Sequence, residues 1–121
     1  MQEGLIIDDN QRTADALKQM LDVLELPARL AYGSGPALSL LSDFIPRFVC
    51  LDLNMPGVDG AEILAYLRGE PRLVNVPVIV VTSDDQPETR QRMLQGGAQV
   101  VLVKPATIDA LESALKKTGV L

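Results

Sequence analysis

Short apolar runs alternate along the chain with segments of helix length, and this alternation constrains the fold more than any other feature of the sequence. In segment 11–24 the apolar residues recur at the spacing of one helical face, whereas segment 48–53 is apolar almost throughout. Continuous apolar strands separated by helices are typical of a parallel sheet that helices cover on both faces. Right-handed crossovers leave few topologies for such a sheet. We therefore predict an α/β fold with one doubly wound five-stranded parallel sheet in the common order 2-1-3-4-5.

Residues that begin or end helices set the boundaries of the expected elements. Pro27 ends the first helix, and Pro87 opens a later one that glycines at 96 and 97 close. Asp59, followed three residues later by Glu62, is typical of a capping box at a helix start. The expected strands are 4–7, 28–32, 48–53, 76–82 and 100–103. The expected helices are 11–24, 34–41, 61–68, 87–95 and 107–117.

Length and composition narrow the class of protein. A chain of 121 residues is expected to form one domain, 1–121. The net charge of -5 argues against a surface that binds nucleic acid. No apolar stretch is long enough for a membrane helix, no signal peptide is expected before residue 4, and a single cysteine fits a reducing compartment such as the cytoplasm. Because the chain has no histidine, it cannot be a His-based acid–base enzyme or a phosphohistidine donor.

Polar residues stand at the carboxyl ends of the first, third, fourth and fifth expected strands. In a doubly wound sheet, ligands bind outside these ends, near the point where the strand order reverses. Four separate strands thus deliver carboxylates, hydroxyls and an ammonium group to one edge. The residues are Asp8, Asp9, Asp52, Thr82, Ser83 and Lys104.

Each of these residues alone has an ordinary explanation. Asp8 taken alone is more often a helix N-cap than a functional residue, and for Asp9 the two readings are about even. Asp52 is different, because a carboxylate within an apolar run is costly without a partner. Three carboxylates in one cleft repel each other, and a divalent cation with oxygen ligands relieves that repulsion. With Lys104 as a second positive charge, the cleft suits a phosphoryl group, for which a carboxylate can be the nucleophile.

Four motifs in order carry a resemblance to a known family: IIDDN (6–10), LDLNMPGVDG (51–60), VPVIVVTS (76–83) and GGAQVVLVKP (96–105). With them the chain resembles, over essentially its whole length, the receiver domain of response regulators in two-component signalling. The resemblance implies a flavodoxin-like (βα)5 fold. It also implies a phosphorelay switch that catalyses only its own phosphorylation and dephosphorylation, and so is not an enzyme in the usual sense.

The resemblance also implies roles for the acidic residues. Asp52 would be the phosphoacceptor, and Mg²⁺ (or Mn²⁺) would be held by Asp8, Asp9, Asp52 and the backbone carbonyl of Asn54. Asp9 would be the more direct ligand of the acidic pair. Asn54 and Asp84 would flank the path of the hydrolytic water and tune the loss of the phosphoryl group.

Further roles fall on the ends of the last two strands. Thr82, Ser83 and Lys104 would contact the phosphoryl oxygens, and the peptide bond before Pro105 would be cis. Two positions depart from the family pattern. Val101 stands where members usually carry Tyr or Phe, and Ala106 stands where a bulky residue is common. These departures leave the chemistry intact but put the usual output mechanism in question.

The expected partners follow from the same resemblance. A sensor histidine kinase or a His-containing phosphotransfer protein would supply the phosphoryl group. An output domain or protein would bind the face formed by helix 87–95, strand 100–103 and helix 107–117, and a homodimer remains open. A binding module that works without phosphorylation is the alternative, although the intact site set argues against it. An aspartyl-phosphate hydrolase of the haloacid dehalogenase type fits less well, because it needs an aspartate where this chain has Asn54.

Overall fold

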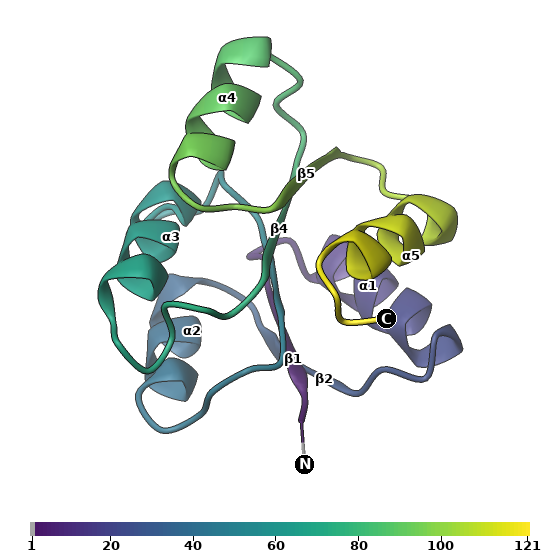
Figure 1. The fold of residues 1–121 in the computed structure, drawn as a ribbon, viewed down its shortest axis with the longest axis horizontal. Helices are drawn as coiled ribbons and strands as arrows, with labels where there is room; N and C mark the ends of the chain where they lie inside the picture. Colours follow the sequence, from purple (N-terminus) through teal and green to yellow (C-terminus); the bar gives the residue numbers. More distant parts are fainter. Residues whose placement is uncertain (1) are drawn as a thin grey trace.

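The computed structural model describes residues 2–121, which form one parallel sheet flanked by helices. Its strand order is β2-β1-β3-β4-β5, so the predicted fold and topology are confirmed (Figure 1). The strands are β1 (Gly4–Ile7), β2 (Ala28–Ala31), β3 (Val49–Leu51), β4 (Val78–Thr82) and β5 (Val100–Val103). The helices are α1 (Gln11–Val23), α2 (Ser34–Leu41), α3 (Gly60–Gly69), α4 (Pro87–Gln95) and α5 (Ile108–Lys117).

Helices cover both faces of the sheet, with α2, α3 and α4 on one side and α1 and α5 on the other (Figure 1). Because successive side chains of a strand point to opposite faces, each strand contributes to two cores. Ile7 and Leu51 pack on the side of α2 and α3, whereas Ile6 and Cys50 pack on the side of α1 and α5. The central strands are therefore apolar on both faces, which explains why their sequence shows no alternation.

The third strand is shorter than the apolar run that predicted it. We expected a strand over 48–53, but β3 ends at Leu51. The backbone N–H of Asp52 still donates to the carbonyl of Ile7 at 2.9 Å, which continues the pairing by one residue. Asp52 therefore leaves the sheet where the neighbouring strand β1 also ends. The fourth strand likewise begins at Val78 rather than at residue 76, since Pro77 has no N–H to give to a ladder.

Side-chain caps begin most of the helices that surround the site. Asn10 caps α1, Thr107 caps α5, and Asp59 forms with Glu62 the predicted capping box of α3. Helix α4 differs, because its N-cap residue Gln86 makes no side-chain cap hydrogen bond. The N–H groups of Thr89 and Arg90 donate instead to the backbone carbonyl of Gln86, at 3.1 and 3.2 Å.

Gly60 brings the start of α3 close to the end of β3. A Cβ atom at this position would lie 2.2 Å from the backbone oxygen of Asp52. Only glycine fits such an approach without a shift of the backbone. The loop 54–59 is thereby held next to Asp52. Among residues 2–121, no helix has the length and apolar character needed to cross a bilayer.

Candidate functional site

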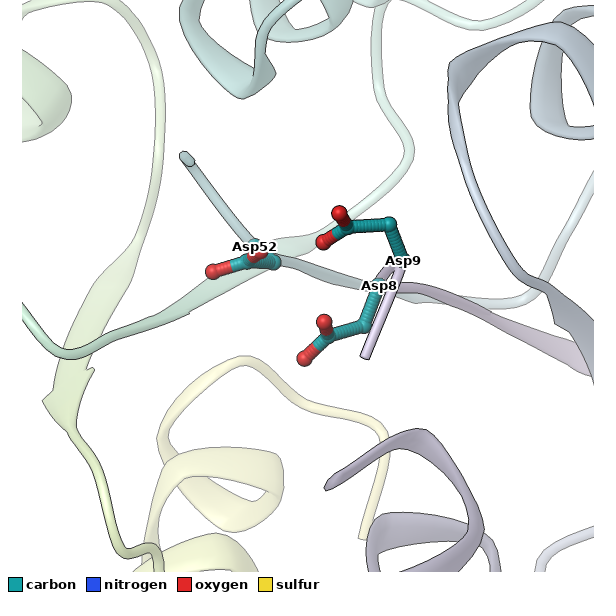
Figure 2. Close-up of side chains that lie close together, drawn as sticks. All are labelled: Asp8, Asp9 and Asp52. Carbon is teal, nitrogen blue, oxygen red and sulfur yellow. The ribbon is translucent and has the colours of Figure 1, made fainter. Parts of the chain in front are cut away.

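Three carboxylates meet where β1 and β3 end. Asp8 and Asp9 follow β1, and Asp52 follows β3. Each offers a carboxylate oxygen, and these atoms lie within 4.8 Å of one another. Figure 2 shows the side chains of Asp8 and Asp9 extending toward Asp52 from the adjacent strand. Asp8 and Asp52 are buried, with 1% and 5% of their surface exposed, whereas Asp9 is exposed to solvent.

Lys104 joins this group from the end of β5. Its Nζ atom donates to Asp8 Oδ2 at 2.9 Å and to Asp52 Oδ1 at 3.2 Å. The backbone N–H of Lys104 bonds to the Thr82 carbonyl at 2.7 Å, and the following peptide bond to Pro105 is cis, as the resemblance implies. Two residues that lie 96 positions apart in the sequence, Asp8 and Lys104, thus form a partly buried ionic contact.

The pKa values of the cluster reflect the balance between burial and charge. Burial raises the pKa of Asp52, and the charge of Asp8 raises it further, while Lys104 opposes both effects without cancelling them. For Lys104, burial acts to lower the pKa, but the hydrogen bond to Asp8 and the charge of Asp52 outweigh it, so its pKa is raised. The site therefore holds more negative charge than Lys104 neutralises.

The carboxylate cluster fits a magnesium ion. Three carboxylates and one ammonium leave a formal charge of about -2, which a divalent cation would balance. Mg²⁺ prefers oxygen ligands, takes one or two carboxylates, and fills its other positions with water and phosphate oxygens. The exposed Asp9 gives the cluster a side open to solvent, through which an ion and its waters can enter. Asn54 lies in the exposed loop after β3.

The predicted phosphate-contacting residues of β4 differ in their surroundings. Thr82 is fully buried, and its hydroxyl accepts the backbone N–H of Asp84 at 3.1 Å. Ser83, the next residue, is exposed. Within residues 2–121, neither side chain is hydrogen-bonded to Asp8, Asp52 or Lys104.

Asp84 lies against the start of α4. Its Oδ1 accepts the N–H of Gln86 at 2.9 Å, and its Oδ2 accepts the hydroxyl of Thr89 at 2.7 Å. The hydrogen bond from Thr89, followed by the one from Gln86, lowers the pKa of Asp84. Asp84 thus accepts the backbone N–H of the N-cap residue itself and a side-chain hydroxyl from the first turn of α4. Its suggested role in orienting a hydrolytic water stays a prediction.

Sequence reasoning overlooked two residues of α4. Thr89 is buried and bonded to Asp84, and the guanidinium of Arg90 donates to the Val101 carbonyl at 3.0 Å. Arg90 is exposed, but its guanidinium is also bonded to β5. The available signal was Asp84 three residues before Pro87, because an acidic residue near a helix start often accepts its N–H groups.

An apolar hollow adjoins the carboxylate cluster on the side of α1. It encloses about 430 Å³ between α1 and the segment that follows β5. Lys104 lies at its wall, so the hollow and the cluster are neighbours. The small side chain of Ala106, where a bulky residue is common in the family, also lines it. The remaining lining residues are Arg12, Thr13, Ala16, Leu17, Met20, Val81 and Pro105.

Comparisons with known proteins agree with this geometry. The model of the response regulator receiver domain family matches residues 5–116. An uncharacterized 14.6 kDa protein from Leptolyngbya boryana is 34% identical over 108 residues, which cover 89% of this chain and 81% of that protein. The response regulator MprA from Mycobacterium tuberculosis is 29% identical over 93% of this chain, and the chain spans only 48% of MprA.

A solved structure extends the likeness to three dimensions. The signal receiver domain of a DNA-binding response regulator from Colwellia psychrerythraea 34H is 31% identical, with a TM-score of 0.91 and full coverage of both chains. The family model alone covers well over half of residues 1–121. With the sheet order and the acidic cluster in place, the chain belongs to the response regulator receiver domain family, the phosphoacceptor module of two-component signalling.

Proposed function

We propose that this domain accepts a phosphoryl group on Asp52 from a phosphohistidine and in that way switches a partner protein or an attached output domain. The observation that carries the proposal is the convergence of Asp8, Asp9, Asp52 and Lys104 from three strands onto one edge of the sheet. A carboxylate so placed can act as a nucleophile, and phosphoryl transfer needs mainly positioning and charge neutralisation.

The transfer exchanges one bond to phosphorus for another. A carboxylate oxygen of Asp52 attacks the phosphorus atom, the bond from phosphorus to the histidine nitrogen breaks, and that nitrogen keeps the electron pair. Lys104 already contacts Asp52 Oδ1 and is positioned to donate to an oxygen of the incoming group. Thr82 would be a second donor, since its hydroxyl accepts a hydrogen bond and donates none among residues 2–121.

Magnesium is the proposed cofactor, with manganese as a substitute. Asp8, Asp9, Asp52 and the backbone carbonyl of Asn54 would hold it. The bound ion would neutralise charge on the phosphoryl oxygens during transfer. The roles of these residues rest on the receiver motif and on the oxygen-rich, electrically unbalanced cluster described above.

The proposed partners occupy two different faces. The donor, a sensor histidine kinase or a His-containing phosphotransfer protein, must approach the edge at which Asp52 lies. We assign the output to the face of α4, β5 and α5, where Leu94 and Val103 are apolar and exposed. We place the domain in the cytoplasm because its cysteine, Cys50, is a free thiol, which fits a reducing compartment.

Labelling with a small phosphodonor tests the proposal. The protein is incubated with acetyl phosphate and Mg²⁺, and its intact mass is measured. The wild type should gain one phosphoryl group, which a chelator should prevent. Asp52→Asn should gain none.

A matched variant controls for the loss of a carboxylate elsewhere. Asp85 is exposed in the loop before α4, and its side chain makes no hydrogen bond within residues 2–121. Asp85→Asn should therefore label like the wild type. Labelling of Asp52→Asn at the wild-type level would show that the acceptor is another residue. A wild type that stays unlabelled would favour the alternative, a binding module that works without phosphorylation.

A further inference from the structure

The segment between β4 and α4 carries a continuous chain of hydrogen bonds from the candidate site to a helix. It begins at the hydroxyl of Thr82, which accepts the N–H of Asp84 at 3.1 Å. It continues through the carboxylate of Asp84, which accepts the N–H of Gln86 at 2.9 Å and the hydroxyl of Thr89 at 2.7 Å. Asp84 therefore contacts the candidate site through its backbone N–H, which donates to Thr82. It contacts the start of α4 through its side-chain carboxylate.

Phosphorylation of Asp52 would act on the first link of this chain. A phosphoryl group brings up to two negative charges and three strong acceptor oxygens. The Thr82 hydroxyl accepts the N–H of Asp84 and makes no hydrogen bond to Asp8, Asp52 or Lys104 within residues 2–121, so phosphoryl oxygens would compete with that N–H for the position of the hydroxyl. Threonine has few χ1 rotamers, and a turn moves its oxygen by a discrete step. A step toward a phosphoryl oxygen would take the Thr82 oxygen away from the N–H of Asp84.

The carboxylate of Asp84, the second part of the hydrogen-bond chain, would transmit this rearrangement to α4. Once the N–H of Asp84 has lost its acceptor, the segment around it must rearrange to find another, since an unpaired polar group is costly. The carboxylate of Asp84 carries Gln86 and Thr89 with it, because its hydrogen bonds to them are charge-assisted. The next residue of α4, Arg90, is held by the Val101 carbonyl at 3.0 Å. The start of α4 can therefore move while its attachment to β5 stays in place.

We propose that Asp84 is a positioning residue that couples the Thr82 hydroxyl to the start of α4, with Thr89 as the contact that holds the coupling in its unphosphorylated arrangement. This proposal rests on the proposed function and names the route by which the same site is read out. It departs from the water-orienting role expected for Asp84, because both carboxylate oxygens of that residue are engaged by α4. It also needs no aromatic ring on β5, where this chain has Val101.

Thr89 offers a clean perturbation, because it is outside the set of residues proposed to contact metal or phosphate. Thr89→Val replaces the hydroxyl with a methyl group of similar size and removes the bond to Asp84 Oδ2. Thr89→Ser keeps the hydroxyl and serves as the matched control. Thr89→Ala removes the same hydroxyl without adding a methyl group, and it should behave like Thr89→Val.

Two measurements on the full chain test the coupling. The first is the set of amide NMR shifts of the free protein. In Thr89→Val the amides of Asp84 and of the first turn of α4 should move toward their positions in the wild type saturated with beryllofluoride and Mg²⁺. The second is the beryllofluoride concentration at half-saturation. It should fall by roughly tenfold in Thr89→Val, because the lost bond, of the order of one charge-assisted hydrogen bond, stabilised only the unphosphorylated arrangement. Thr89→Ser should match the wild type in both.

The outcomes separate the coupling from the function beneath it. If the wild type binds beryllofluoride while Thr89→Val and Thr89→Ala keep its free-state shifts and half-saturation concentration, the coupling through Asp84 is wrong and the proposed function stands. A higher half-saturation concentration in both variants would also overturn the coupling. If the wild type itself neither binds beryllofluoride nor takes label from acetyl phosphate, the proposed function fails, and the coupling fails with it.

Discussion

Replacing Lys104 with methionine should destabilise the metal-free protein strongly, and Mg²⁺ should offset part of the loss. The Lys104 side chain is 19% exposed and contacts two carboxylates, Asp8 and Asp52, that are 1% and 5% exposed. Methionine keeps most of the length and apolar stem of lysine but removes the charge. The variant therefore leaves two buried carboxylates without their cation.

The size of the effect follows from the burial of the pair. Removing one partner of a fully buried ion pair costs about 3–5 kcal/mol, because the other charge stays buried. Partial exposure of Lys104 reduces this cost, and so does the raised pKa of Asp52, since that carboxyl can take up a proton more readily. We expect a loss of about 2–3 kcal/mol in the free energy of unfolding at neutral pH. For a chain of this size this corresponds to a fall in Tm of roughly 10 °C.

Urea denaturation of wild type and Lys104→Met, with chelator and with saturating Mg²⁺, checks the prediction. Mg²⁺ should stabilise the variant more than the wild type, because the variant site carries one more uncompensated negative charge. Lys116→Met is the matched control. Its side chain is 65% exposed and lies 3.7 Å from Glu112, so its loss should cost no more than about 0.5 kcal/mol. The reasoning is refuted if Lys104→Met without Mg²⁺ unfolds at the wild-type urea concentration, or if Mg²⁺ stabilises both proteins equally.

Three further predictions concern the same part of the molecule. The pKa of Asp52 is raised above its ordinary value of 3.8 on folding, so its ionisation costs stability as pH rises from there through the folded pKa. Asp52→Asn should accordingly be more stable than the wild type at pH 7 in chelator, as measured by thermal or urea unfolding. Equal stability of the two proteins at pH 7 would contradict this. In Mg²⁺ titrations followed by NMR, Asp9→Asn should weaken Mg²⁺ binding more than Asn54→Ala, because Asn54 would offer only its backbone carbonyl. Equal losses of Mg²⁺ affinity in the two variants would show that these ligand roles are wrong. Burial raises the pKa of Cys50 to about 12, so the thiol should resist a disulfide reagent at pH 8 in the native protein and react at once in urea, and rapid native labelling would contradict its burial.

The sheet could be predicted from the sequence because both of its faces are covered. Runs such as 48–51 and 76–81 are apolar throughout, and only a strand buried on two sides requires that. The ends of these runs were predicted less well. Burial continues past the last residue of the strand, as at Asp52 and Leu53, so hydrophobicity alone extends β3 beyond Leu51.

The candidate cluster could be predicted for a related reason. In a parallel sheet all carboxyl ends lie at one edge, so polar residues that follow separate strands must meet. The sequence therefore predicts that Asp8, Asp52 and Lys104 lie close together, but it does not predict that Lys104 bonds to both carboxylates. The bonds from Asp84 to Gln86 and Thr89 could not be predicted in the same way, since they depend on how the segment after β4 turns into α4.

The composition of α4 explains why this helix is suited to transmit a signal. Helix α5 is anchored by three buried apolar side chains, Leu111, Ala114 and Leu115, whereas the buried residues of α4 are Thr89 and Met93. An element with little apolar burial opens or shifts at low cost. Its position then depends on a few directional contacts, here the bonds from Thr89 to Asp84 and from Arg90 to the Val101 carbonyl. Because a hydrogen bond is lost over a displacement of about an ångström, a small turn of Thr82 is enough to change the balance that holds α4.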